Sequence, residues 1–156
     1  NKAERYVHIM TPYLILDYEM LQALTFAAKR GVEVCIILPH IPDKKYAFAL
    51  AKTHYKDLIA AGVKAYEYLP GFIHSKVFVS DDKRAVVGTI NLDFRSLYLH
   101  FECAAYMHEV PATRDIEKDM QETMQISKLI TMNDVKKEKL SMRLAGILLK
   151  FIAPLM

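Results

Sequence analysis

The residues best suited to chemistry lie close together, between positions 74 and 91. His74 and Lys76 are two residues apart, and Thr89 and Asn91 follow a glycine at the end of the next β-forming run. A histidine can attack or transfer a proton, a lysine carries a positive charge, and hydroxyl and amide groups donate hydrogen bonds. This set suits a phosphate group whose negative charge shifts during transfer. Each residue taken singly is more typical of a solvated strand end.

A β-hairpin is expected to position these residues. Residues 77–79 are β-formers, residues 80–83 are typical of a turn, and residues 84–87 are a second β-forming run. Side chains two apart on a strand share a face, so His74 and Lys76 should point the same way at the end of the first strand. The glycine that ends the second run allows another backbone to approach closely.

The complete pattern, H-x-K-x4-D-x6-G-T-x-N, runs from His74 through Asp81 to Asn91. It resembles the HKD motif of the phospholipase D superfamily, and the continuation GTINLDFRS is similar to the second motif of bacterial cardiolipin synthases. The resemblance extends from about Tyr6 to the C-terminus. Such synthases have N-terminal membrane helices and two HKD motifs, whereas this chain has one motif and no apolar run near the ~20 residues that cross a bilayer. We therefore expect the C-terminal catalytic half of such an enzyme.

The resemblance implies transfer in two displacement steps through a phosphohistidine. One HKD histidine attacks phosphorus, while the other protonates the leaving alcohol and then deprotonates the incoming one. Because His74 belongs to a second motif, the resemblance gives it the general acid and base role. Lys76, Thr89 and Asn91 would bind the phosphoryl oxygens. The resemblance implies no metal and no other cofactor, and the sequence shows no carboxylate cluster typical of a metal site.

Two carboxylates complete the implied catalytic set, Asp81 and Glu102. Asp81 lies seven residues after His74 and past the strand, so we expect it to make structural hydrogen bonds rather than share the face of His74. Glu102 lies in the apolar run 101–108, which predicts a buried strand, and a buried carboxylate needs a partner. Superfamily members have a carboxylate there that binds the catalytic imidazole, and Glu102 matches that position. An ion pair with a nearby lysine or arginine is the alternative.

The implied reaction is transphosphatidylation, in which two phosphatidylglycerol molecules give cardiolipin and glycerol. The implied partners are these lipids, a membrane surface, and either the missing N-terminal HKD half or a second copy of this chain. The implied location is the bacterial cell membrane, with the catalytic domain on the cytoplasmic side. Two alternatives stay open: a single-motif phosphodiesterase or nuclease that is active as a homodimer, and a catalytically incomplete half-domain that binds lipid.

Length and composition fit one phospholipase D-like domain over residues 1–156. The hydrophobic fraction of 53% is enough for a core, and a net charge of +3 is too small to indicate a nucleic acid partner. Cys35 and Cys103 lie far apart in apolar runs, without disulfide or zinc spacing. Both are predicted to be small buried core residues.

The order of elements predicts an α/β fold. Strands are expected at residues 5–10, 32–38 and 63–68, with one helix after the N-cap candidate Asp17 and another over residues 46–61. Alternation of strand and helix favours parallel pairing with right-handed crossovers. We expect a mixed, mostly parallel sheet of six or seven strands with helices on both faces.

Residues 112–156 are expected to form a C-terminal helical extension. Pro111 should open a helix that runs to about Ile130 with Ser127 on its inner face, and residues 133–151 should form a last helix. One side of that last helix is apolar, and basic residues cluster on or near the other: Lys136, Lys137, Lys139, Arg143 and Lys150. Packing on this domain or on the missing half, and contact with an anionic membrane, both fit such a helix.

Four polar residues outside the motif have alternative interpretations. His40 follows the second strand, where ligands bind in open α/β sheets, although a solvent-exposed loop histidine is the simpler interpretation. His54 lies on an apolar helix face and is expected to be packed and hydrogen-bonded rather than a ligand. Arg95 and Ser96 could contact an anionic substrate, and Arg95 could equally form a structural ion pair.

Overall fold

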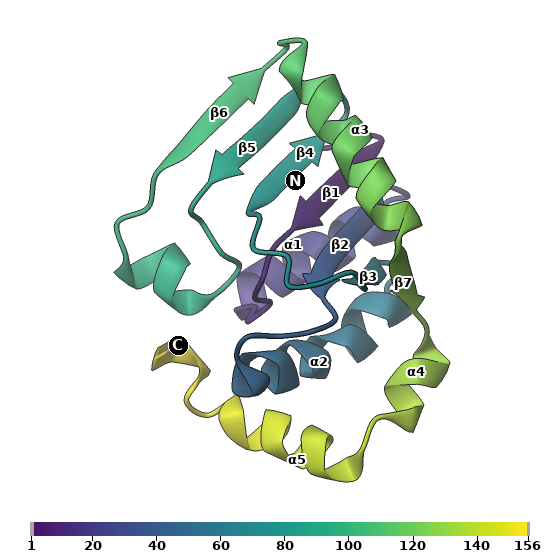
Figure 1. Ribbon diagram of the computed structural model, residues 1–156, viewed down its shortest axis with the longest axis vertical. Helices are drawn as coiled ribbons and strands as arrows, with labels where there is room; N and C mark the ends of the chain where they lie inside the picture. The colour runs from purple at the N-terminus through teal and green to yellow at the C-terminus, as the bar shows by residue number, and fades with distance from the viewer. Residues whose placement is uncertain (1, 156) are drawn as a thin grey trace.

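One seven-stranded sheet organises the protein, for which a computed structural model describes residues 2–155 (Figure 1). In chain order the elements are β1 (Tyr6–Met10), α1 (Tyr18–Lys29), β2 (Glu33–Pro39), α2 (Lys45–Ala60), β3 (Lys64–Tyr68), β4 (Val77–Ser80), β5 (Arg84–Gly88), a short π-helix (Arg95–Leu99), β6 (Ala104–His108), α3 (Ala112–Gln125), β7 (Ser127–Ile130), α4 (Met132–Lys137), α5 (Leu140–Leu149) and a final 3-10 turn (Ala153–Leu155).

The strand order is β6-β5-β4-β1-β2-β3-β7. Only the pairs β1–β2 and β2–β3 are parallel, and the other four pairs are antiparallel. The prediction of a mixed α/β sheet is therefore confirmed, but the prediction that it is mostly parallel is wrong. Two neighbouring strands can be parallel only if the chain crosses back between them, and α1 and α2 are the helices that do so here. The other four pairs of neighbouring strands run in opposite directions.

The first half of the chain folds as its pattern predicts. The side chain of Asp17 accepts a hydrogen bond of 2.6 Å from the backbone N–H of Met20, so it caps α1. Gly31 and Gly62, which follow α1 and α2, have φ values of 90° and 98°. This left-handed backbone conformation, which glycine adopts at little cost, ends both helices before the next strand.

The core lies on both faces of the sheet. Leu24 of α1 and Leu58 of α2 pack with Ile36 on one face, whereas Met120 of α3 packs with Ile37 on the other. Successive residues of a strand point to opposite faces, so the interior strand β2 is apolar and buried from Val34 to its end. Figure 1 shows α1 behind the strands and α3 in front of them, which confirms the prediction of helices on both faces.

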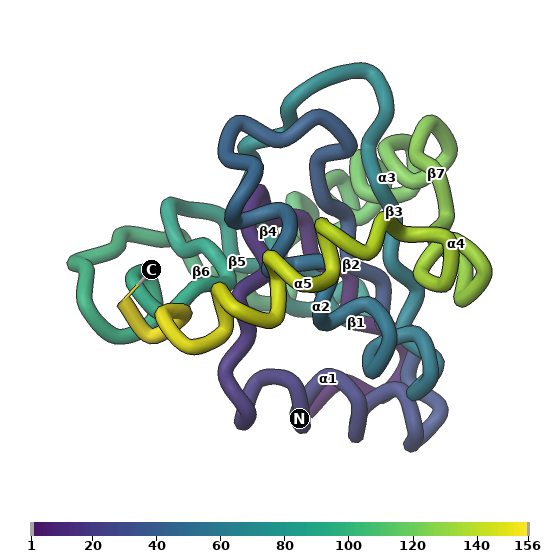
Figure 2. Tube along the Cα trace, turned by 90° about the horizontal axis from the view of Figure 1, so that it is seen from below, coloured from purple at the N-terminus to yellow at the C-terminus, as the bar shows by residue number. Residues whose placement is uncertain are grey.

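The C-terminal region differs from the predicted pair of helices. Residues 127–130 form strand β7 rather than the end of a helix, because they pair in antiparallel register with the free edge of β3. Ser127 therefore lies on a strand and not on the inner face of a helix. The last helix is also divided, into α4 and α5, at Glu138 and Lys139. Figure 2 shows α5 running along α2, with which it packs. Among residues 2–155, no helix is both long enough and apolar enough to cross a membrane.

Strand β6 also differs from the sequence prediction. It was expected to be buried, but it is the last strand at one edge of the sheet and most of its residues are exposed. Cys35 is buried as predicted, whereas Cys103, just before β6, is exposed. An apolar run of this length does not reveal whether a strand lies in the centre of a sheet or at its edge, and that difference decides its burial.

Candidate active site

The chemically capable residues meet where β4 begins and β5 ends. The two strands are antiparallel, with Val77 opposite Val87, so the start of one lies beside the end of the other. The backbone N–H of Gly88 donates to the carbonyl of Lys76 at 3.2 Å, which extends the pairing past the last register pair. This hairpin brings the segment before β4 next to the segment after β5, as the sequence predicts.

His74 and Lys76 lie side by side just before β4, so their predicted proximity is found, although neither residue is part of the strand. The ammonium of Lys76 donates to the carbonyl oxygen of His74 at 2.7 Å and lies 3.0 Å and 2.9 Å from Nδ1 and Nε2 of its ring. The Lys76 residue is buried, whereas His74 is exposed. The geometry fixes one positive charge beside an accessible imidazole.

Both members of this pair have a lowered pKa. Desolvation is the main cause of the lowered pKa of His74, followed by the charge of Lys76, while Asp43 acts in the opposite direction. Desolvation also lowers the pKa of Lys76, against the attraction of Glu102 and other carboxylates. The imidazole is thereby held neutral near pH 7, in the form that can accept a proton or attack phosphorus.

Gly88 occupies a position that no larger residue can take without a shift of backbone. A Cβ at Gly88 would lie 2.3 Å from the carbonyl oxygen of Cys103 and 2.5 Å from the Cα of Ala104. The close approach predicted for this glycine is therefore real, and it comes from the segment that enters β6. It lets Thr89 reach that segment directly.

Thr89 links the end of β5 to Glu102. Its backbone N–H donates to the carbonyl of Cys103 at 3.0 Å, and its hydroxyl accepts from the N–H of Cys103 at 3.0 Å and donates to the carboxylate of Glu102. Hydrogen bonds from Thr89 first, and then from Ser96, lower the pKa of Glu102. The carboxylate of Glu102 is therefore ionised, and it points toward the hydroxyl of Thr89.

The predicted bond between Glu102 and the imidazole is not formed. Among residues 2–155, Glu102 makes no hydrogen bond to His74, and it lies before β6 rather than within a buried strand. The physical reason is topological: β5 separates β6 from β4, and each step across a sheet is about 4.8 Å. Glu102 instead reaches Thr89 on the neighbouring strand end, which sequence spacing alone does not reveal.

Asn91 belongs to a small network of hydrogen bonds with Ser96 and Asp93. Its side-chain N–H donates to the hydroxyl of Ser96 at 3.2 Å, and the backbone N–H of Ser96 donates to Asp93 at 2.7 Å. Within the described part of the chain the buried Oδ1 of Asn91 has no hydrogen-bond partner. A buried amide oxygen without a partner is costly, so this side chain is available for a ligand group that can donate to it.

A cavity of about 210 Å³ opens beside this network. Arg95 lines it, is exposed, and forms no ion pair within residues 2–155, so the structural ion pair considered for it is not found. His74, Lys76 and Thr89 do not line the cavity, which lies next to them. The polar residues that line it include Lys44, Asn91, Asp93, Ser96, His100 and Glu102.

The loop after β2 contributes residues that the sequence analysis did not single out. Asp43 and Lys44 act electrostatically on His74, and Asp43 accepts a hydrogen bond of 2.6 Å from the hydroxyl of Tyr13. The available signal was the position of this loop at the carboxyl end of a parallel strand. His40 in the same loop is half-exposed, as the simpler interpretation predicts, and its ring binds Glu67 at 2.7 Å.

Two further residues lie away from this site. The carboxylate of Asp81 accepts three backbone N–H groups, from Glu4 at 3.0 Å, Arg5 at 2.9 Å and Tyr6 at 3.0 Å. These are the structural hydrogen bonds expected of Asp81, at the opposite end of β4 from His74. His54 is packed in the core as expected, but its Nδ1 has no partner among the described residues, so the predicted hydrogen bond is absent.

A family model, described as the cardiolipin synthase PLD-like domain, matches residues 1–124 of the chain. The chain belongs to this family. It is also 35% identical over 156 residues to the cardiolipin synthase of Geobacillus sp. (strain WCH70), covering all of this chain and 31% of that protein. An uncharacterized protein of Streptococcus mutans serotype c is 58% identical over 156 residues, with the chain covering 34% of it. The chain thus spans about a third of the length of these relatives.

A solved structure shows that the fold is that of a phospholipase D-like domain. Nuc from Salmonella typhimurium, described as a phospholipase D family member, superposes with a TM-score of 0.70 at 19% sequence identity. The match covers 83% of this chain and 84% of that one. At this identity the likeness concerns the fold, and the sequence family defines membership of the cardiolipin synthase group.

Proposed function

We propose that the chain supplies one catalytic half of a phosphatidyl transferase that makes cardiolipin and glycerol from two molecules of phosphatidylglycerol. The observation that carries this proposal is the His74–Lys76 pair at the end of β4, in a chain of the cardiolipin synthase family. The relatives that are named cardiolipin synthases support the choice of lipid substrate.

His74 acts as the general acid and base in this proposal. A histidine from the other HKD motif attacks phosphorus, its N–P bond forms as the P–O bond to the glycerol headgroup breaks, and His74 gives its proton to the departing oxygen. Neutral His74 then takes the proton of the hydroxyl on the second phosphatidylglycerol. The oxygen of that hydroxyl forms a new P–O bond as the N–P bond breaks, which returns the attacking histidine.

The electrostatic setting supports both halves of this role. The lowered pKa of His74 keeps the free imidazole neutral, which is the form that can accept a proton. A bound phosphodiester anion attracts positive charge, so it raises the pKa of the imidazole and favours the protonated form that the first step needs. In this proposal Lys76, Thr89 and Asn91 bind the phosphoryl oxygens, Asn91 through its side-chain N–H and Thr89 after its single hydroxyl proton turns from Glu102 to the substrate.

The attacking histidine comes from an N-terminal half of the protein or from a second copy of this chain. The chain spans about a third of its relatives, which leaves room for such a half in proteins of their length. The substrates are membrane lipids, so the proposed place of action is the cytoplasmic surface of the bacterial membrane.

The test is the conversion of radiolabelled phosphatidylglycerol to cardiolipin by the full-length protein and its His74→Ala variant. Loss of a general acid and base should reduce the rate by a factor of about 10² to 10⁴. The matched control is His108→Ala, an exposed histidine of β6, which should keep the full rate. Cardiolipin formation by folded His74→Ala at the level of the control would exclude the proposed role.

A second candidate is a phosphodiesterase built from two copies of this chain. It is favoured by the match to Nuc, because 83% of this chain superposes on 84% of that phospholipase D family member. The two candidates differ in the mass and activity of residues 1–156 alone. A dimer by light scattering that hydrolyses a model phosphodiester supports the second candidate. A monomer that binds phosphatidylglycerol liposomes without turnover is the behaviour of a lipid-binding half-domain that needs its other half.

A further inference from the structure

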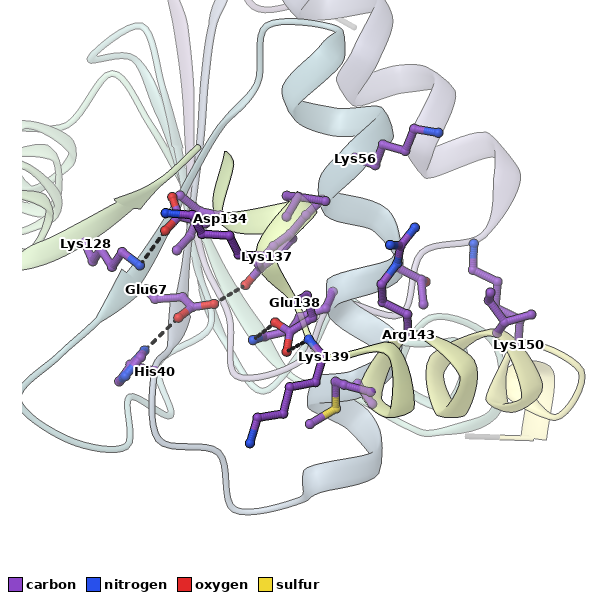
Figure 3. Close-up of a pocket in the computed structure, with 18 residues that line it drawn as sticks. His40, Lys56, Glu67, Lys128, Asp134, Lys137, Glu138, Lys139, Arg143 and Lys150 are labelled. Atoms are coloured by element: carbon purple, nitrogen blue, oxygen red, sulfur yellow. Dashed lines mark hydrogen bonds and ion pairs between the residues drawn. The ribbon is translucent and has the colours of Figure 1, made fainter. Parts of the chain in front are cut away.

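A second pocket lies between α2, α4, α5 and the edge of the sheet at β3 and β7 (Figure 3). Its volume is about 420 Å³, twice that of the cavity beside His74, and the two cavities share no lining residue. The proposed transfer reaction uses no part of it. Its size and separate position indicate a binding site of its own.

The lining of this pocket is strongly basic. Seven lysine and arginine residues line it against three carboxylates. Each carboxylate already has a partner: Glu67 accepts from Tyr55 at 3.2 Å and binds His40, Asp134 pairs with Lys128 at 2.8 Å, and Glu138 pairs with Lys52. Figure 3 marks these interactions with dashed lines. Two of the three carboxylates are thus paired with lysines, and the third is hydrogen-bonded within the wall.

Five cations of the lining remain without an acidic partner among residues 2–155. They come from α2, from the end of α4, from the α4–α5 junction and from α5 with the residue that follows it, and Figure 3 shows Arg143 and Lys150 extending to the same side. Like charges gathered around a concave surface raise the local potential and concentrate anions there. The five residues are Lys56, Lys137, Lys139, Arg143 and Lys150.

The helices that carry these charges are held at a fixed spacing. A Cβ at Gly146 of α5 would lie 2.5 Å from Cγ2 of Thr53 and 2.6 Å from the carbonyl oxygen of Ala49, both on α2. The helices therefore cross in direct contact at Gly146. The Lys52–Glu138 pair joins α2 to the α4–α5 junction as well. The pocket is in consequence formed before any ligand arrives, which reduces the entropic cost of binding.

The pocket and its surroundings also offer apolar contacts. Ile130, Val135, Met142 and Ile147 lie among the cations of the lining. On the outer side of α5, beside the pocket, a row of large apolar side chains is exposed: Leu140 at 68%, Leu144 at 52%, Leu148 at 68% and Phe151 at 83%. An exposed apolar row next to unpaired cations is the surface that an anionic lipid interface complements.

We propose that this pocket binds the phosphate group of an anionic phospholipid, at a site separate from the one where transfer occurs. The identification of a lipid as the carrier of that phosphate rests on the proposed function, whereas the phosphate chemistry rests on the unpaired cations. A lipid held here places the apolar row of α5 against the acyl region, so the catalytic domain lies on the surface from which its substrates come. A free phosphate anion shares the same recognition chemistry.

The test is lysine footprinting of the full-length protein with an acetylating reagent, read by mass spectrometry. The probes are a short-chain phosphatidylglycerol, the matching phosphatidylcholine and inorganic phosphate. We expect phosphatidylglycerol to protect Lys137, Lys139 and Lys150 in the His74→Ala variant as in the parent, which separates this site from transfer. Arg143→Glu with Lys150→Glu should weaken protection of the remaining lysines at least about tenfold, because the change removes two cations that can bind the phosphate and adds two carboxylates that repel it.

The control reverses two exposed charges elsewhere, Lys83→Glu with Lys118→Glu, and should leave protection unchanged. Protection by phosphatidylglycerol alone identifies a lipid site, and equal protection by inorganic phosphate identifies a phosphate site without a lipid role. Equal protection by phosphatidylcholine, no change on charge reversal, or lysines that are already shielded without any probe would each overturn the proposal. Protection without cardiolipin synthesis would contradict the proposed function alone.

Discussion

The ammonium of Lys76 lies within 3.0 Å of both ring nitrogens of His74 and 2.7 Å from its carbonyl oxygen. The positive charge of Lys76 therefore lies close to both nitrogen atoms of the imidazole. A second proton on that ring would bring two positive charges into contact, so the pair favours neutral His74. The same ammonium is available to a phosphoryl oxygen placed against the ring.

Lys76→Met is expected to raise the pKa of His74 and to lower the transfer rate. Removal of a neighbouring positive charge favours the protonated imidazole, so the pKa moves up toward its ordinary value of about 6.5, because Lys76 is one cause of its present lowering. NMR titration of the His74 ring measures this shift without any need for turnover. Lys83→Met, in the turn after β4, is the control and should leave the His74 titration where it is. A downward shift in Lys76→Met would contradict the electrostatic argument.

Gly88→Ala should damage both stability and activity. The added methyl would meet backbone atoms of Cys103 and Ala104 at 2.3 Å and 2.5 Å, and backbone cannot turn aside as a side chain can. We expect a loss of about 2 kcal/mol in the free energy of unfolding, the usual cost of overpacking, together with displacement of Glu102 from the site. Urea unfolding measures the first effect.

Gly71→Ala is the matched control for this change. No atom lies within 4 Å of a Cβ built at Gly71, and its φ is not positive. Its stability should stay within about 0.5 kcal/mol of the parent. If the two alanine variants were equally stable, the close approach at Gly88 would not affect the free energy of unfolding.

The sequence predicted the elements that carry the site better than it predicted their partners. Local patterns predicted the hairpin, the proximity of His74 and Lys76 and the cap at Asp17, because each depends on neighbours in the chain. Gly88 itself indicated that a backbone could approach there, but not that it would be that of Cys103 and Ala104. The place of a strand within the sheet depends on distant residues. For that reason Glu102 was assigned to His74 although β5 lies between their strands.

The same limit explains the errors in the C-terminal region. Residues 127–130 have helical neighbours, and only the free edge of β3 makes them a strand. The basic pocket between α2 and α5 depends on the close contact of these helices at Gly146. The sequence does not reveal this contact, because Ala49 and Thr53 of α2 are far from Gly146 in the chain.

Asp81→Asn should reduce stability and leave the chemistry intact. Burial opposes ionisation, yet the three backbone N–H groups of Tyr6, Arg5 and Glu4 lower the pKa of Asp81 overall. An amide offers one acceptor atom in place of two, so at least one N–H loses its partner at a cost of about 2 kcal/mol. Thermal unfolding should show the loss, while cardiolipin formation well below the midpoint should match the parent. Asp119→Asn, an exposed residue of α3, is the control and should change neither.

Thr89→Val should lower the rate, whereas Thr89→Ser should preserve it. Valine keeps the shape of threonine but cannot donate to Glu102, and the hydrogen bond from Thr89 is the first cause of the lowered pKa of Glu102. We therefore expect the pKa of Glu102 to rise in the valine variant and the transfer rate to fall by about tenfold or more, the effect of about 1.4 kcal/mol. Steady-state kinetics of the three proteins, with an NMR titration of Glu102, measure both effects. Equal rates in the serine and valine variants would remove the hydroxyl from the mechanism.

His54 should make the fold sensitive to acid. Burial first, and then the charge of Lys150, lower the pKa of His54 to about 4. Between pH 6.5 and 4 the unfolded chain binds a proton at this position while the folded chain does not, so the free energy of unfolding falls as the pH falls. The loss approaches about 3 kcal/mol by pH 4, at about 1.4 kcal/mol for each pH unit. Urea unfolding of residues 1–156 at several pH values measures this slope.

His54→Leu should remove that contribution to the slope and raise stability at neutral pH. The Nδ1 atom of His54 is buried and has no partner among the described residues, so an apolar side chain of similar size relieves its desolvation cost. His108→Leu, on the exposed strand β6, is the matched control and should retain the acid sensitivity of the parent. A His54→Leu variant that lost stability between pH 6.5 and 4 as steeply as the control would assign the acid response to another group.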